Sequence, residues 1–224
     1  MSVEPIQATP PPSLARRLPR ALAVLGVVAF VALLAYGLSV KNPNDTIDQK
    51  LSDGVTAPAP GFSLELLERG TVPGELGGKL SPAAADGTVA LDELRGTPVV
   101  MNLWASWCSP CREEAATLER AWRSQGRRGV LFLGIDMQDL RGDAREFLDR
   151  YGLTYPTIRD PRRDVAHDYG ATGIPETYFI SARGRVVGHV VGVVSARQLA
   201  GGVAAARSGR VAGRARGGAI RRSR

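Results

Sequence analysis

The hydrophobic positions of the chain form one long uncharged run near its start, followed by shorter runs separated by polar, glycine-rich turns. Short, nearly continuous apolar runs are typical of buried strands, and a helical spacing of apolar residues is typical of helices that pack on a sheet. The predicted strands are 62–67, 99–105, 130–136, 155–158, 176–181 and 185–191, and the predicted helices are 110–125, 143–152, 160–170 and 195–207.

This order of elements indicates an α/β fold with a central mixed β-sheet flanked by helices. The early strands are joined by helices and should be parallel, whereas the last two should form an antiparallel hairpin that turns at residues 182–184. Residues 71–87 are rich in Gly and Pro and are expected to form a loop. Residues 41–60 are rich in Asn, Asp, Pro and Ala and are expected to be a linker.

The long apolar run, residues 21–40, contains no charged residue. A helix of that length can cross a hydrocarbon core of about 30 Å, which predicts a single transmembrane anchor. Basic residues gather just before the run, at Arg16, Arg17 and Arg20. This asymmetry predicts that residues 1–20 are cytoplasmic and that the rest of the chain lies on the extracytoplasmic side of the cell membrane. A cleaved signal peptide is the alternative interpretation of the same run.

The net charge of +7 is unevenly distributed. Ten arginines and no acidic residue follow Glu176, while the rest of the chain carries 19 basic and 22 acidic side chains. The basic character therefore belongs to the C-terminus, and residues 208–224 are predicted to be an Arg-rich disordered tail. Basic tails can bind nucleic acid or anionic lipid, but on an exported chain we expect no nucleic-acid partner.

The chain has two cysteines, Cys108 and Cys111, at the junction of a predicted strand and helix. A disulfide across so small a loop stabilises a fold little, so the pair is better suited to thiol-disulfide exchange. At the helix N-terminus Cys108 should have a lowered pKa and act as the nucleophile. Cys111, one turn further on, should be more buried and resolve the mixed disulfide. Trp107 should provide an apolar rim for a docking peptide.

A Cys-x-x-Cys pair can also be half of a zinc site, but zinc needs four ligands. No further cysteine occurs, and the two histidines, His167 and His189, are far apart in the sequence. We therefore expect no metal, and we interpret both histidines as surface or turn residues. The expected redox group is the cysteine pair itself, without another cofactor.

Residues 99–111, which read VVMNLWASWCSPC, resemble the active-site segment of thioredoxin-fold proteins. The resemblance extends over most of the predicted domain, which we place at residues 61–207. Residues 173–177, which read GIPET, resemble the second landmark of these proteins. It implies that Pro175 is in cis and faces the disulfide, and that the backbone of Ile174 pairs with a bound substrate strand.

Two differences from ordinary thioredoxins indicate which group of thioredoxin-fold proteins the chain resembles most. Asn102 replaces a buried Asp six residues before the first cysteine, and residues 136–157 contain an extra helix and strand. Both features are similar to those of the membrane-anchored TlpA, ResA and CcmG (DsbE) group of cytochrome c biogenesis. The resemblance implies a reductant of the haem-binding cysteines of apocytochrome c, kept reduced by a membrane electron donor of the CcdA or DsbD kind.

Two acidic residues are candidates for proton handling. Glu114 lies three residues after Cys111 on the same predicted helix face, where burial should raise its pKa, and it matches the CxxCxxE pattern of the group. Glu176 follows the expected cis proline and matches the group's GxPET motif. By contrast, Glu113 and Glu119 are predicted to be charges on the helix surface.

Three functions remain open at this point. The first is a dedicated reductant of apocytochrome c, and the second is a general exported thiol-disulfide reductant or oxidant. The third is a non-catalytic binding module that uses the groove around Trp107 and Pro175. A peroxiredoxin is disfavoured because its peroxidatic cysteine belongs to a different motif.

Overall fold

The computed structural model describes residues 18–40 and 45–218 of a chain that divides into two units, 1–42 and 43–224. In the first unit, α1 (Leu18–Val40) is a continuous helix over the predicted anchor, and the apolar side chains described on it are exposed. Among the described residues, we find no helix that is both long and apolar enough to cross a membrane. The anchor at 21–40 stays a prediction, and residues 1–17 lie outside the described part of the chain.

The second unit is built on a mixed sheet, and its described strands run in the order β1-β8-β7-β4-β5-β6-β2-β3, with β9 also paired to β8. The strand bounds are β1 (Ala57–Pro58), β2 (Ser63–Glu68), β3 (Thr88–Ala90), β4 (Val99–Trp104), β5 (Leu131–Met137), β6 (Thr157–Asp160), β7 (Glu176–Ile180), β8 (Arg185–Val191) and β9 (Gly213–Arg216). β4, β5 and β6 are parallel, and β7 and β8 form the predicted antiparallel hairpin. The prediction of a mixed central sheet is confirmed.

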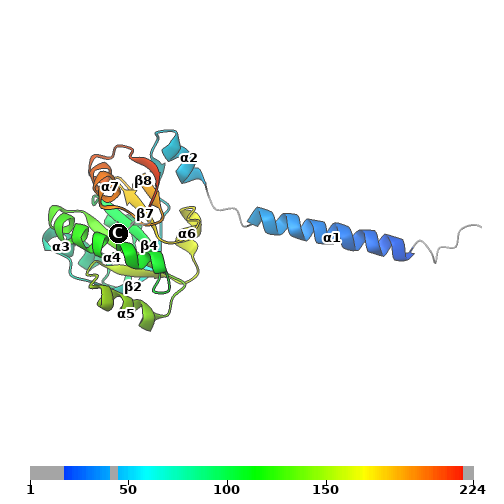
Figure 1. Cartoon of the computed structure of the whole chain (residues 1–224), viewed down its shortest axis with the longest axis horizontal. Helices are drawn as coiled ribbons and strands as arrows, with labels where there is room; N and C mark the ends of the chain where they lie inside the picture. Colours follow the sequence, from blue (N-terminus) through cyan, green and yellow to red (C-terminus); the bar gives the residue numbers. More distant parts are fainter. Residues whose placement is uncertain (1–17, 41–44, 219–224) are drawn as a thin grey trace, which may run out of the picture. The chain divides into compact units, whose positions relative to one another are not determined.

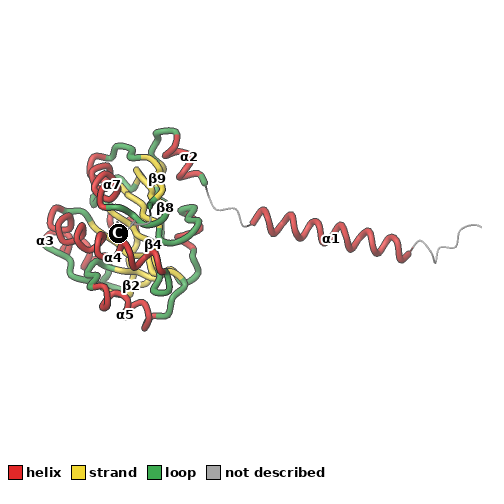
Figure 2. Tube along the Cα trace, viewed as in Figure 1, coloured by secondary structure: helices red, strands yellow, loops and turns green. Residues whose placement is uncertain are grey.

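Helices lie around the yellow strands of the sheet in Figure 2. Their bounds are α2 (Thr46–Ser52), α3 (Gly74–Ala83), α4 (Ser109–Gln125), α5 (Arg141–Tyr151), α6 (Asp164–Asp168) and α7 (Ala196–Ser208), with short 3-10 turns at Leu91–Leu94 and Gly126–Arg128. The close packing of α7 on β7 depends on Gly202, because a Cβ there would lie 2.2 Å from the ring of Phe179.

The predicted linker at 41–60 is wrong from residue 45 onward. α2 buries Ile47 and Leu51, which are four residues apart and therefore share one helix face, and β1 pairs with β8. Residues 41–44 lie outside the described part of the chain. The folded domain thus begins before residue 61, and α2 belongs to it (Figure 1).

Two further segments differ from the prediction. The expected loop at 71–87 contains α3, which buries Leu76 and Leu80. The expected disordered tail begins with an ordered strand, because β9 pairs in parallel with β8 over residues 213–216. Its exposed arginines alternate with Gly213 and Ala215, and Ala215 packs against the core, so the strand is held by main-chain pairing to β8 and by this small apolar contact. Residues 219–224 lie outside the described part.

Candidate active site

Cys108 and Cys111 form a disulfide at the N-terminus of α4, where the sequence places them. Their Cα atoms are 5.3 Å apart. Cys108 is the N-cap residue, and its sulfur accepts a hydrogen bond of 3.2 Å from the backbone N–H of Cys111. Pro110 occupies the first turn, where an N–H is not needed. The helix end thus directs N–H groups at the Cys108 sulfur and favours its thiolate.

The disulfide belongs to a cluster of apolar side chains, and the prediction that Cys111 is more buried than Cys108 is wrong, because each residue is 3% exposed. The cluster around the pair includes Trp104 from β4 and Phe147 from α5, whose rings stack with centroids 4.7 Å apart. The predicted extra helix therefore contributes to the apolar cluster that contains the disulfide. Ile174 packs against the same cluster, which brings the loop before Pro175 to the cysteines.

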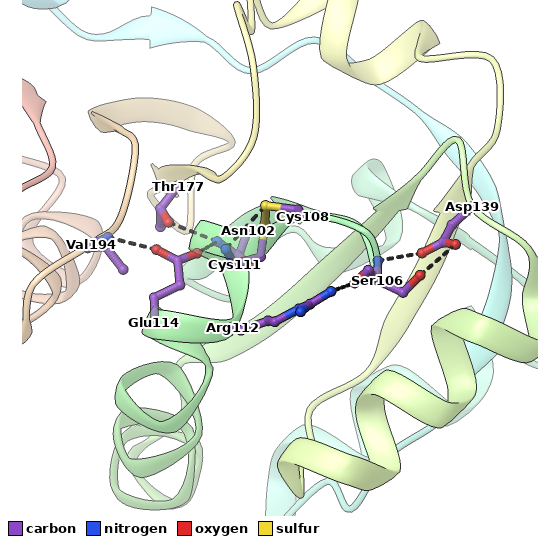
Figure 3. Close-up of a disulfide and its surroundings, with 9 residues drawn as sticks. All are labelled: Asn102, Ser106, Cys108, Cys111, Arg112, Glu114, Asp139, Thr177 and Val194. Atoms are coloured by element: carbon purple, nitrogen blue, oxygen red, sulfur yellow. Dashed lines mark hydrogen bonds between the residues drawn. A yellow bond between two sulfur atoms is a disulfide. The ribbon is translucent and has the colours of Figure 1, made fainter. Parts of the chain in front are cut away.

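Glu114 is the acidic group on the buried face of α4, one turn after Cys111. It is 1% exposed, and its two oxygens accept hydrogen bonds from Asn102 Nδ2 at 2.8 Å and from the backbone N–H of Val194 at 2.7 Å. The Asn102 amide also donates to Thr177 Oγ1 at 3.1 Å. Figure 3 shows this group beside the disulfide.

The electrostatics of Glu114 follow from its surroundings. Burial raises the pKa of the carboxyl from 4.5 to about 7, although the two donated hydrogen bonds favour the ionised form. Such a group can both accept and release a proton near neutral pH. The expectation that burial raises the pKa of Glu114 is therefore confirmed, and Asn102 is the residue that orients the carboxylate.

The loop before Cys108 is held by the β5–α5 connection. Asp139 accepts hydrogen bonds from the backbone N–H and the hydroxyl of Ser106, at 2.5 and 2.9 Å (Figure 3). Trp107 is 57% exposed, and its indole N–H donates to the carbonyl of Gln138 at 3.2 Å. The tryptophan therefore presents an exposed, oriented ring beside the disulfide. The sequence predicted a role for Trp107, but it has no local pattern that would have identified Gln138 and Asp139 as the residues that support this loop.

The peptide bond between Ile174 and Pro175 is cis, as the resemblance implied. The next residue, Glu176, is buried, and its Oε1 accepts hydrogen bonds from the N–H and hydroxyl of Thr172, both at 2.9 Å, and from the N–H of Gly173 at 3.0 Å. These contacts fix the loop that leads to the proline.

Glu114, which belongs to α4, lies against one face of β7, and the carboxylate of Glu176 lies on the opposite face. Consecutive strand residues point to opposite faces of a sheet. Thr177 accepts a hydrogen bond from Asn102, the partner of Glu114, so its side chain is on the Glu114 side of β7. Glu176 is on the other side, where it accepts a hydrogen bond of 3.0 Å from the Tyr178 hydroxyl. Among the described contacts of the Glu176 carboxylate, none involves a cysteine. No described hydrogen bond joins Glu176 or Glu114 to a cysteine, so the roles of both residues in proton transfer to the sulfurs stay predictions.

The interpretation of His189 as a surface or turn residue is wrong. It lies on β8 and is 1% exposed, with Nε2 at 2.9 Å from Glu176 Oε2 and Nδ1 at 2.6 Å from Asp48 Oδ1. His167, by contrast, is exposed, as predicted. Neither Asp48, in the expected linker, nor His189, in an apolar strand, carried a sequence signal of this contact.

The two remaining acidic residues of α4, Glu113 and Glu119, differ in burial. Glu113 is exposed, as predicted. Glu119 is buried, so its prediction as a surface charge is wrong: it accepts hydrogen bonds from the N–H and hydroxyl of Thr154, at 2.8 and 2.6 Å, and pairs with Arg123 at 2.7 Å. It therefore joins α4 to the chain that enters β6.

A CxxC disulfide at the start of a helix, a cis proline after Ile174, which packs against the cysteine cluster, and a mixed sheet define a thioredoxin-like thiol-disulfide oxidoreductase. The AhpC/TSA family matches residues 55–189, and the chain belongs to this family.

Comparison with individual proteins gives a finer result. The chain is 34% identical over 183 residues to the thiol:disulfide interchange protein DsbE of Allochromatium vinosum, which covers 80% of this chain and 87% of the relative. It is 25% identical over 168 residues to the thiol-disulfide oxidoreductase ResA of Bacillus subtilis, covering 75% and 83%. A solved structure of a DsbE-type interchange protein from Chlorobium tepidum matches with a TM-score of 0.54 and 25% identity, covering 67% of this chain and 96% of that one. The protein is thus an oxidoreductase of the DsbE and ResA type.

Proposed function

We propose that this protein reduces the haem-binding cysteine pair of apocytochrome c on the extracytoplasmic side of the membrane. The observation that carries the proposal is the buried Glu114–Asn102 pair one turn beyond Cys111. A carboxyl group with a pKa of about 7 at this position lets dithiol chemistry proceed near neutral pH. The resemblance to cytochrome c biogenesis proteins supports the direction and the substrate.

The first step is attack by the Cys108 thiolate on the substrate disulfide. The substrate S–S bond breaks, a Cys108–substrate disulfide forms, and the released substrate thiolate takes a proton from solvent. Glu114 then accepts the proton of Cys111. The Cys111 thiolate attacks the Cys108 sulfur, which forms the disulfide seen in the structure and releases the second substrate thiolate, to be protonated in turn. Two electrons pass from the dithiol to the substrate.

Substrate docking is assigned to the surface around the cysteines. The exposed ring of Trp107 supplies an apolar rim, and the backbone at Ile174, before Pro175, pairs with an extended substrate segment. Main-chain pairing gives affinity for a polypeptide, while the ring contributes contact area.

Membrane attachment and electron supply complete the proposal. Residues 21–40 anchor the protein, with the catalytic domain outside the cytoplasm. In an oxidising compartment a dithiol needs electrons from the membrane, here from a donor of the CcdA or DsbD kind. The cysteine pair carries both electrons, so no further cofactor enters the scheme.

Deletion of the gene tests the substrate. We expect loss of covalently attached haem from c-type cytochromes, restored by the wild-type chain and not by Cys108→Ser. Normal cytochrome c levels in the deletion strain would overturn the assignment to apocytochrome c. Restoration by Cys108→Ser would instead indicate a binding module.

The reduction potential of the Cys108–Cys111 couple tests the direction. A reductant should have a potential near or below that of thioredoxin, roughly −270 mV. A potential close to that of the strong oxidant DsbA, roughly −120 mV, would indicate an exported oxidant instead.

A further inference from the structure

A chain of charged groups, buried at His189 and Glu176 and partly exposed at Asp48, runs from α2 to the loop before Pro175. Each ring nitrogen of His189 contacts a carboxylate: Nε2 is 2.9 Å from Glu176 Oε2, and Nδ1 is 2.6 Å from Asp48 Oδ1. Its ring stacks on Tyr178 with centroids 3.9 Å apart and planes 10° apart. The other oxygen of Asp48 lies 2.5 Å from Arg214 Nε on β9.

The contacts favour a charged imidazole. An ionised carboxylate only accepts hydrogen bonds and a neutral imidazole has a single N–H, so two ionised carboxylates, one on each ring nitrogen, are both satisfied only by the imidazolium. Burial lowers the pKa of His189, but its hydrogen bonds to Asp48 and Glu176 outweigh this and raise it overall. For Glu176 and Asp48, burial raises the pKa, and the contacts with His189 outweigh it, so that both stay ionised.

The ionised state of Glu176 matters because its carboxylate accepts the hydrogen bonds that position residues 172–173 of the loop. Oε2 of Glu176 accepts hydrogen bonds from the imidazolium and from the Tyr178 hydroxyl. Oε1 accepts three more, from the N–H and hydroxyl of Thr172 and from the N–H of Gly173. A protonated carboxyl has fewer acceptor sites and forms weaker hydrogen bonds. The loop is continuous with Ile174, which packs against the disulfide cluster.

We propose that Asp48 and His189 are positioning residues for the substrate-binding loop 172–175. They keep Glu176 anionic, and Glu176 shapes the loop so that an extended polypeptide can dock beside Cys108. This inference goes beyond the proposed function: it rests on thiol-disulfide exchange with a polypeptide and not on the identity of that polypeptide. It also gives α2, at the start of the folded domain, a part in substrate binding.

The test compares two disulfide substrates of the reduced full chain in detergent. One is a synthetic peptide with a CxxCH disulfide, which needs the loop, and the other is a nitrobenzoate disulfide reagent, which does not. For Asp48→Asn and His189→Gln we expect KM for the peptide to rise about tenfold, with kcat within about twofold of wild type, because a charge-assisted contact is weakened. The rate with the small reagent should not change.

Asp45→Asn is the matched control, because Asp45 is an exposed residue beside α2 whose side chain makes no capping hydrogen bond. It should behave as wild type with both substrates. An unchanged peptide KM in Asp48→Asn, or equal losses with both substrates, would overturn the proposal. Asp48 is at the edge of the network, with its side chain 22% exposed, so this variant remains informative even where His189→Gln does not fold.

The pH profile supplies a readout that a purely structural role would not move. The groups that face the His189 ring are Asp48 from α2, Glu176 and Tyr178 from β7, and Arg214 from β9. The imidazolium is lost as pH rises through its raised pKa, so the ratio of peptide KM to reagent KM should rise on the alkaline side. In Asp48→Asn that rise should begin at lower pH, because one stabilising carboxylate is gone. An identical profile in both proteins would contradict the proposal.

Discussion

Replacing Glu114 by glutamine removes a buried ionisable group while preserving its shape. The folded protein holds the pKa of Glu114 at about 7, above the ordinary value of 4.5, because the carboxyl is buried. A folded-state pKa above the unfolded value means that this stability contribution is complete below about pH 4.5 and is lost as pH rises towards 7. Glutamine cannot ionise, so Glu114→Gln should not show this loss.

The magnitude follows from the two pKa values. The interval from 4.5 to about 7 corresponds to about 3 kcal/mol, at about 1.4 kcal/mol per pH unit. Both partners of the carboxylate, Asn102 and the Val194 N–H, are donors, so the glutamine amide loses one acceptor contact. That loss costs about 1 kcal/mol at every pH. The variant should therefore be less stable than wild type at low pH and more stable by about 2 kcal/mol above neutral pH.

Urea unfolding of the oxidised chain in mild detergent measures the difference, at about pH 4.5, 6 and 8. Groups other than Glu114 titrate in both proteins, so their contributions cancel in the comparison. Glu113→Gln, on the exposed side of the same helix turn, is the control and should show little difference at any pH. A free-energy difference between wild type and Glu114→Gln that does not change with pH would refute the reasoning.

Three further substitutions test other parts of the structure. Cys111→Ser should leave Cys108 able to attack but unable to be released, so substrate-linked adducts should accumulate on non-reducing gels; their absence would argue against Cys108 as nucleophile. Ile47→Ala should lower the free energy of unfolding by about 3 kcal/mol, whereas Val55→Ala, at a position 53% exposed, should cost little; equal small effects would mean that α2 is not part of the core. Asp139→Ala should raise KM for a peptide disulfide by releasing the loop before the nucleophile, and an unchanged KM would contradict that role.

The parts of the fold that the sequence predicted are those with strong local patterns. The segment from β4 to α4 combines a continuous apolar run, a CxxC pair and Pro110, and each of these features specifies its own local conformation. The cis bond at Pro175 was predicted by resemblance to known proteins and not by any physical property of the segment. Spacing and capping arguments therefore located the cysteines at the start of α4. The conformation of the loop at Pro175 could be predicted only from the resemblance to known proteins.

The parts that the sequence did not predict depend on partners far along the chain. The one apolar pair of α2 lies in a polar, Pro-containing segment, and its burial depends on the sheet it covers. β9 forms a strand because β1 pairs with only residues 185–186 of β8 and leaves residues 188–191 of that edge available. Its Arg–Ala alternation resembles a solvated tail when considered alone. His189 stands in an apolar strand, where a single histidine has no distinctive spacing.

Glu114 and Glu176 show why burial by itself does not determine the state of a carboxyl group. Both are 1% exposed, yet burial raises the pKa of Glu114 to about 7, while the pKa of Glu176 is lowered. The described partners of Glu114 are uncharged donors, whereas Glu176 has the imidazolium of His189 at 2.9 Å. An adjacent positive charge compensates the loss of hydration, and neutral donors compensate it only in part. Glu114, on α4, therefore has a carboxyl group whose pKa lies near neutral pH, whereas Glu176, on β7, is held as an anion by His189.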